Sequence, residues 1–219
     1  MPRIVAALAT AVLALADARA GEVRGVVRFE GTPPPTRRLA VTKDQRTCGE
    51  DLPDEGLVVA DGKLANVVVT VRGAPAAPPA RASLDQRRCR FVPHVQVVPV
   101  GSTLDLLNGD PLLHSVHGWA GRVTRFDVPM ASQRERSPAP LDKPGLIAVR
   151  CDIHGWMAAW VLVADGPAAV SGGDGAFAIS GVPAGTYTVT AWHERLGERT
   201  AEVKVPPDGA ARVDFAYGG

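Results

Sequence analysis

The sequence has no excess of charge of either sign once its first 20 residues are set aside. It contains 24 Lys and Arg residues and 23 Asp and Glu residues, and Arg3, Asp17 and Arg19 lie in that amino-terminal stretch. The rest of the chain therefore has 22 basic and 22 acidic side chains. A neutral chain has no basic field that would attract nucleic acid or an anionic membrane surface. We expect neither as a partner.

The sequence also lacks an apolar run long enough to span a bilayer, which takes roughly 20 residues in a helix. Its most apolar segment, residues 4–16, follows Arg3 and precedes the small-residue sequence Ala18-Arg19-Ala20. This is the pattern of a secretory signal peptide cleaved after Ala20. No Cys stands at the cleavage site, which argues against a lipid anchor. We predict a periplasmic or secreted protein with no transmembrane segment in the mature chain.

Cysteine is scarce, with three residues at positions 48, 89 and 151. An exported protein tends to pair its thiols, so three cysteines imply one disulfide and one free thiol. Three pairings are open in principle. Cys48 and Cys89 each lie in a polar, turn-rich stretch, QRTCGED and DQRRCRF, without a His and a Met beside them. We therefore predict a Cys48–Cys89 disulfide and a free Cys151.

No long stretch has the 3.6-residue apolar period of an amphipathic helix, and no internal repeat is present. Short Val-rich segments instead alternate with Gly, Pro and Asp, which predicts an all-β fold. The expected strands cover residues 22–29, 64–73, 94–100, 103–108, 145–150 and 158–164, and a second group covers residues 175–180, 185–193, 199–205 and 211–217.

The second group of strands follows a turn signal at residues 164–167. Its run DGAFAISGVPAGTYTVTAWHE places Phe177, Ile179, Tyr187 and Val189 on alternating positions of one expected buried face. The run resembles the carboxypeptidase regulatory-like (transthyretin-like) β-sandwich, which implies a structural or adhesive module. We predict a signal peptide at residues 1–20, a β-sandwich with an N-terminal extension at 21–165, and a smaller β-sandwich at 166–219.

One short stretch concentrates the scarce residue types. CDIHGWM, residues 151–157, holds one of the three Cys, one of the five His and one of the three Met residues. Because it connects two expected strands, Cys151, His154 and Met157 can converge from a single loop. A thiolate, an imidazole and a thioether favour copper over hard cations, and a thioether is not a usual zinc ligand. A copper site of this kind needs a second His. His114 can supply it, after a strand that ends at Asn108 and a Gly-Asp-Pro turn.

These two motifs resemble those of the cupredoxins, the blue copper proteins that include amicyanin and plastocyanin. The resemblance covers about residues 95–165, through the short Cys-x-x-His-x-x-Met loop and through an Asn six residues before His114. It implies a Greek-key β-sandwich that binds one type 1 copper. The implied ligands are His114, Cys151 and His154 in equatorial positions and Met157 in the axial position.

The resemblance also implies roles for neighbouring residues. Asn108 is expected to steady the Cys-bearing loop by hydrogen bonding, and Trp156 is expected to cover the loop from solvent. His117 lies three residues after His114 and would face the opposite side of an extended strand, while His94 stands near Cys89. A contribution of either histidine to the site stays open at this point.

Three functions are compatible with this pattern. A type 1 site is filled by protein ligands, so we expect single-electron transfer with a redox partner protein, a cytochrome or a dehydrogenase or oxidase, and no enzymatic activity. Five His residues are too few for the trinuclear cluster of a multicopper oxidase. The same ligands would serve a copper carrier or sensor. A structural or carbohydrate-binding module with a degenerate motif would bind no metal.

Overall fold

Strands make up almost all of the regular structure in the computed structural model, which describes residues 21–131 and 133–218. The predicted signal peptide, residues 1–20, lies outside these described residues. Among them the single helix is α1 (Gln45–Cys48), and no described helix is long and apolar enough to cross a membrane. The predicted all-β fold is confirmed.

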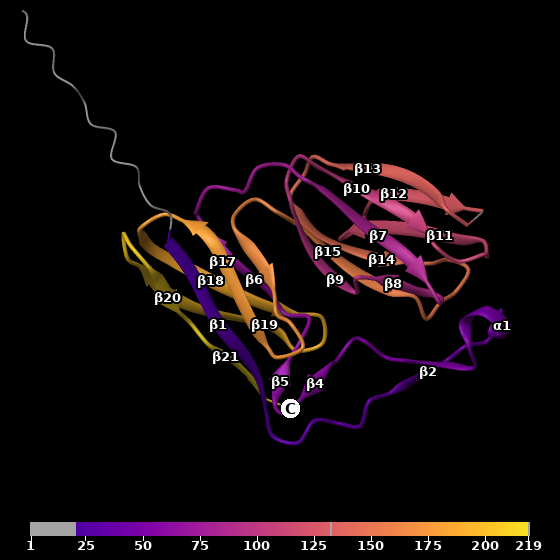
Figure 1. The fold of residues 1–219 in the computed structure, drawn as a ribbon, viewed down its shortest axis with the longest axis horizontal. Coiled ribbons are helices and arrows are strands. Elements are labelled where there is room, and N and C mark those ends of the chain that lie inside the picture. Colours follow the sequence, from indigo (N-terminus) through magenta and orange to yellow (C-terminus); the bar gives the residue numbers. More distant parts are fainter. Residues whose placement is uncertain (1–20, 132, 219) are drawn as a thin grey trace, which may run out of the picture.

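The central sandwich is built from residues 81–164 and consists of two sheets (Figure 1). One has the strand order β13 (Glu135–Leu141), β10 (Ser102–Asn108), β7 (Arg81–Arg87) and β8 (Arg90–Val92). The other has the order β12 (Val123–Met130), β11 (His114–Ala120), β14 (Gly145–Arg150), β15 (Ala158–Ala164) and β9 (Val95–Pro99). Strands β14 and β15 have the predicted bounds, whereas β7, β8, β11, β12 and β13 were not predicted.

The flanking sandwich lies beside the central one and also has two sheets (Figure 1). Its larger sheet has the order β17 (Ala176–Val182), β1 (Gly21–Glu30), β5 (Lys63–Leu64) and β4 (Val59–Ala60), and β1 also pairs with β20 (Ala210–Arg212) and β21 (Phe215–Gly218). Its smaller sheet has the order β16 (Ala168–Val170), β6 (Val68–Arg72), β18 (Gly185–His193) and β19 (Gly197–Val205).

The strands form because apolar side chains recur at every second position and can be buried on one face of a sheet. In β1, the alternating side chains of Val23, Val27 and Phe29 enter the core of the flanking sandwich, which is separate from that of the central sandwich. Full burial of one such side chain stabilises the fold by about 1.5–3 kcal/mol. Each sandwich therefore has its own hydrophobic core.

The two sandwiches divide the chain differently from the predicted division at residue 165. The residues of β1, β4, β5 and β6 were expected in the N-terminal extension of the first sandwich, but all four strands belong to the flanking one. Strand β1 pairs antiparallel with β17 and parallel with β20 and β21. A two-residue period identifies the buried face of a strand but not its partner, so these pairings of distant segments could not be read from the pattern.

The segment between β1 and β4, residues 31–58, leaves the flanking sandwich and runs along the central one before it returns (Figure 1). We call it the strap. It contains α1 and a small antiparallel pair of strands, β2 (Arg38–Ala40) and β3 (Asp51–Pro53). The predicted Cys48–Cys89 disulfide is confirmed, with a Cα–Cα distance of 5.2 Å, and it ties the strap to the central sandwich.

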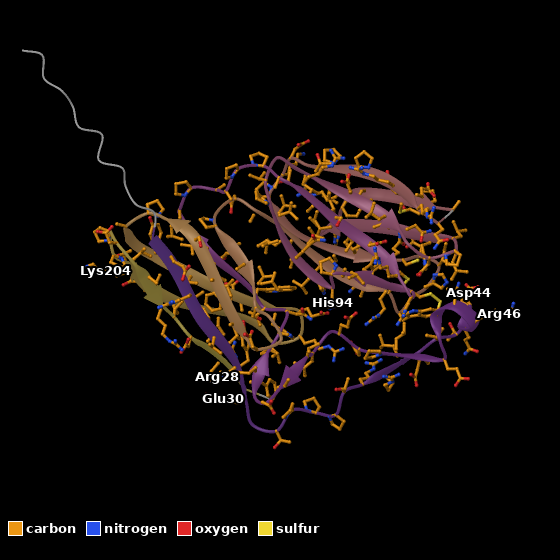
Figure 2. The ribbon with its side chains drawn as sticks, viewed as in Figure 1. Arg28, Glu30, Asp44, Arg46, His94 and Lys204 are labelled. Carbon is orange, nitrogen blue, oxygen red and sulfur yellow. A yellow bond between two sulfur atoms is a disulfide. The ribbon has the colours of Figure 1, made fainter. Side chains whose placement is uncertain are left out.

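Side chains also join the two sandwiches directly. His94, at the start of the central strand β9, donates from Nδ1 to the carbonyl oxygen of Ala158 at 3.0 Å, and its Nε2 meets the carboxylate of Glu194 from the flanking sandwich. The Trp160 and Trp192 rings pack edge to face across the same boundary, with centroids 5.1 Å apart. Figure 2 shows His94 between the two sandwiches. These contacts account for His94 as a residue of the junction.

Candidate metal centre

Cys151 and Met157 occupy matching positions at the ends of two paired strands. Strands β14 and β15 are antiparallel, and their last pair is Arg150 with Ala158. Inward positions alternate along β14 through Ile147 and Val149, so Cys151 is the next inward residue, and on β15 the same alternation makes Met157 inward. Both sulfur-bearing side chains are buried in the core of the central sandwich. The strand period therefore directs both ends of the loop toward the same end of this core.

The loop between these two residues is held by its own backbone hydrogen bonds. The backbone N–H of Met157 donates to the carbonyl oxygen of His154 at 2.9 Å, which closes a tight turn. The backbone N–H of His154 donates to Sγ of Cys151 at 3.4 Å, and the backbone N–H of Ser115 does the same at 3.4 Å. These donors stabilise negative charge on the sulfur.

His114 enters the site from a neighbouring strand, as the first residue of β11. The turn before it is fixed by Asn108, whose Nδ2 donates to the carbonyl oxygens of Leu112 and Met130 at 2.8 and 3.0 Å. The Oδ1 atom of Asn108 accepts from the backbone N–H of Asp110 at 3.1 Å. The expected role of Asn108 therefore changes: these bonds steady the turn that carries His114, and none of them reaches the Cys-bearing loop.

Three of the four predicted ligands meet at one buried point. Nδ1 of His114 lies 2.9 Å from Nδ1 of His154, and Sγ of Cys151 lies 3.9 and 3.7 Å from these two nitrogens. His114, Cys151 and His154 form a group whose ligand atoms could hold a metal ion. Met157 is buried in the same core, at the far end of the turn from Cys151. Its axial role stays a prediction.

The outward nitrogens of both imidazoles face carboxylates. Nε2 of His114 is 3.1 Å from Oδ2 of Asp110, and Nε2 of His154 is 2.9 Å from Oδ2 of Asp44. Because an ionised carboxylate only accepts hydrogen bonds, each Nε2 carries a proton, and the Nδ1 atom of a neutral ring is then a lone-pair donor. Histidines that bind metals in proteins usually donate their other N–H in this way. A proton or a metal ion between two such nitrogens, 2.9 Å apart, relieves the repulsion between their lone pairs.

In the metal-free protein a proton can supply this positive charge. Burial lowers the pKa of an imidazole, but the hydrogen bonds with Asp110 and Cys151 outweigh it and raise the pKa of His114 to about 9. Burial also raises the pKa of a thiol, but hydrogen bonds from His114 and from backbone N–H groups lower the pKa of Cys151 to about 6. At neutral pH the centre therefore holds the Cys151 thiolate beside the His114 imidazolium. A metal ion that binds here replaces this proton.

Trp156 lies against the ligand loop. Its ring centroid is 5.1 Å from that of His154, and its Nε1–H donates to the carbonyl oxygen of Cys89 at 3.1 Å. The half-buried indole thus links the loop to the residue that forms the disulfide. It covers one side of the His154 ring.

The remaining histidines lie away from this group. His117 is three residues along β11 on the other face, where its Nδ1 is 3.4 Å from Oδ2 of Asp152. His193 is buried in the flanking sandwich and accepts from the backbone N–H of Arg195 at 3.2 Å.

Asp44 is a residue of this site that the sequence interpretation missed. Nothing in the sequence around Asp44 indicates a contact with His154, which lies 110 positions later.

Comparison with known proteins gives only partial matches. No protein-family model matches the sequence, and no curated protein matches it. A copper-containing nitrite reductase from Thermus scotoductus is 22% identical with a TM-score of 0.36, and the match covers 51% of this chain and 26% of that one. This chain thus matches only about a quarter of the nitrite reductase.

Two small copper proteins match over nearly their whole length. A purple cupredoxin from Nitrosopumilus maritimus is 19% identical with a TM-score of 0.35, and the match covers 38% of this chain and 99% of that one. Amicyanin from Paracoccus versutus is 16% identical with a TM-score of 0.35, and the match covers 44% of this chain and 97% of that one. The fit of the donor set to a soft metal ion rests on the geometry of His114, Cys151 and His154.

Proposed function

We propose that this chain is a type 1 copper protein, which binds one copper ion through His114, Cys151, His154 and Met157 and transfers single electrons. The observation that carries the proposal is the convergence of two Nδ1 atoms and one sulfur at a single buried point. One thiolate and two imidazoles, with a thioether nearby, are the donor set of blue copper sites. The carboxylates behind both imidazoles fix the ring orientation that such a site needs.

Burial of the ligands supports electron transfer over catalysis. The exposed fractions of His114, Cys151, His154 and Met157 are 0, 2, 0 and 1%. A substrate would need an open coordination position that it can reach, whereas an electron can pass through the covering atoms. The same burial opposes delivery of the ion, because a copper carrier must release its cargo to an acceptor. The copper-bound protein would exchange electrons with a redox partner protein.

The disulfide is consistent with the proposed export of the chain. Disulfides persist in oxidising compartments such as the periplasm or the extracellular space and are rare in the cytosol. Both sulfurs of the Cys48–Cys89 bond are buried, so it acts as a structural part of the fold. A periplasmic or secreted electron carrier is the function that agrees with the site and the disulfide together.

Metal analysis and a visible spectrum of the purified protein test the proposal. We expect one copper per chain and an intense thiolate-to-copper band, which Cys151→Ser should abolish. His117→Asn is the matched control, since His117 lies on the other face of the strand that carries His114. It should leave the band unchanged. A wild-type protein that takes up no copper, or that takes it up without this band, would refute the assignment.

A further inference from the structure

The strap brings one acidic residue to the metal centre from a distant part of the sequence. Asp44 stands at the N-cap of α1, where a carboxylate commonly accepts from the backbone of the first helical turn. It makes no such capping bond. Its Oδ2 instead lies 2.9 Å from Nε2 of His154. The Asp44 carboxylate therefore contacts the predicted ligand His154 and does not cap the helix that it precedes.

Asp44 also separates the ligand from solvent. The His154 side chain is fully buried, while that of Asp44 is 42% exposed. Figure 2 shows Asp44 beside α1, close to the yellow bond of a disulfide. The polar edge of the His154 ring thus faces the carboxylate, and the carboxylate faces water. Removal of Asp44 would change both the charge and the hydration of this edge.

The disulfide fixes the position of Asp44 relative to His154. The backbone N–H groups of Thr47 and Cys48 both donate to the carbonyl oxygen of Asp44, at 2.9 and 3.0 Å, so that Asp44 and Cys48 share one helical turn. Cys48 is bonded to Cys89, whose backbone carbonyl accepts from Trp156 of the ligand loop.

Cys89 is connected to the other histidine as well. Its backbone N–H donates to Oδ2 of Asp110 at 2.8 Å, and the same oxygen lies 3.1 Å from Nε2 of His114. Cys89 is therefore connected, through short chains of contacts, both to Asp44 beside His154 and to Asp110 beside His114. The carboxylate beside His154 is connected to Cys89 through the disulfide, whereas the carboxylate beside His114 accepts directly from the backbone N–H groups of Cys89 and Arg88.

We propose that Asp44 is a positioning residue of the copper centre and that the Cys48–Cys89 disulfide holds it against His154; this rests on the proposed copper function. The carboxylate fixes the His154 ring and increases the basicity of its Nδ1 atom. Its negative charge favours the oxidised, more positively charged ion over the reduced one. The strap thereby lowers the reduction potential and tightens the binding of Cu(II).

Two substitutions of Asp44 separate its charge from its hydrogen bond. The backbone of Asp44 has a φ of 55°, a left-handed conformation that Asn and Gly adopt readily. Asp44→Asn keeps a side-chain oxygen that can accept from Nε2–H but removes the charge, and Asp44→Gly removes both. Asp51→Asn is the matched control, because Asp51 lies on the same strap, is 49% exposed and pairs with Arg38.

The affinities for Cu(II) and Cu(I), measured by chelator competition, and the reduction potential are the readouts. Loss of a partner of a metal-binding His typically weakens binding about 10–100-fold. We expect such a loss of Cu(II) affinity in Asp44→Gly, a smaller one in Asp44→Asn, and no change in Asp51→Asn. Each tenfold loss for Cu(II) relative to Cu(I) raises the potential by about 59 mV. A blue wild-type protein whose potential is unchanged by both Asp44 substitutions would overturn the inference and leave the copper function standing.

The role of the disulfide is tested by Cys48→Ser/Cys89→Ser, with circular dichroism to verify the fold. This variant should reproduce the potential of Asp44→Gly, and adding Asp44→Gly to it should cause little further change, since both act through one contact. Additive shifts would show that the disulfide does not act through Asp44. If the Cys48→Ser/Cys89→Ser variant does not fold, Asp44→Asn and Asp44→Gly still decide whether Asp44 is a positioning residue. Failure of the wild type to bind copper would instead refute the proposed function.

Discussion

Copper binding should release one proton from the protein at neutral pH. The pKa of Cys151 is lowered to about 6 and that of His114 is raised to about 9. Between these values the sulfur is already a thiolate, and His114 carries the proton that the metal must displace. The measured affinity should therefore fall about tenfold, or about 1.4 kcal/mol, for each unit by which the pH drops. Below about pH 6 the Cys151 thiolate is protonated as well, so copper must displace a second proton and the fall in affinity should become steeper.

Calorimetric titration with copper in two buffers of different ionisation enthalpy measures this proton count directly. We expect about one proton per copper ion at about pH 7.5 and about two near pH 5. Asp110→Asn removes the carboxylate that raises the pKa of His114, so this variant should release less than one proton at about pH 8. His117→Asn serves as the control and should behave like the wild type.

An affinity for copper that stays flat between about pH 6 and pH 8, or a release of no protons at neutral pH, would contradict this prediction. Either result would mean that His114 is not the protonated partner in the metal-free centre. A release of two protons at neutral pH would mean that Cys151 is a thiol before copper binds. The number of protons released therefore distinguishes the protonation state of His114 from that of Cys151.

Three other predictions concern single side chains. Met157→Leu should keep copper and colour but raise the reduction potential, measured by voltammetry, because a weak donor to the oxidised ion is lost; copper loss as complete as in Cys151→Ser would contradict an axial role. Trp156→Ala removes the ring beside His154, so copper should stay bound but transfer faster to an external chelator in stopped-flow measurements; an unchanged rate would mean that the indole is no barrier. Burial lowers the pKa of His193 to about 4, below its ordinary value, so its neutral form contributes stability above about pH 6.5 that is lost as the pH falls toward 4. Urea unfolding should show the wild type losing about 2 kcal/mol more than His193→Gln between pH 7 and pH 5, and equal losses would contradict this.

The parts of the site that are local in sequence could be predicted from the sequence. Cys151, His154 and Met157 lie in one loop, and strands β14 and β15 begin and end where the short apolar runs do. His114 follows a turn that the Gly-Asp-Pro sequence marks. For these elements, the two-residue period gives the buried face of each strand, and the ligand spacing gives the arrangement of the side chains in the loop.

The parts that depend on distant segments could not be predicted. Asp44 reaches His154 only because the strap crosses from one sandwich to the other, and the strap has no period of its own. The bonds of Asn108 were assigned to the wrong loop, since the sequence does not say which backbone oxygens lie near its amide. The segment 211–217, expected as one strand, is interrupted between β20 and β21, although both pair with β1.

The pairing of β1 affects the order in which the chain can fold. A ribosome makes β1 before any of its partners, and three of them, β17, β20 and β21, come from residues 176–218, long after the fourth, β5. All strands of the central sandwich, in contrast, lie between residues 81 and 164 and are complete before those partners exist. Until those three are made, the Val-rich β1 can pair only with the two-residue strand β5, and its remaining backbone groups form an edge that can associate with other chains. We therefore expect that a chain without residues 210–218 keeps its copper colour but is cut by protease near β1. Loss of the colour on the same truncation would show that the two sandwiches fold as one unit.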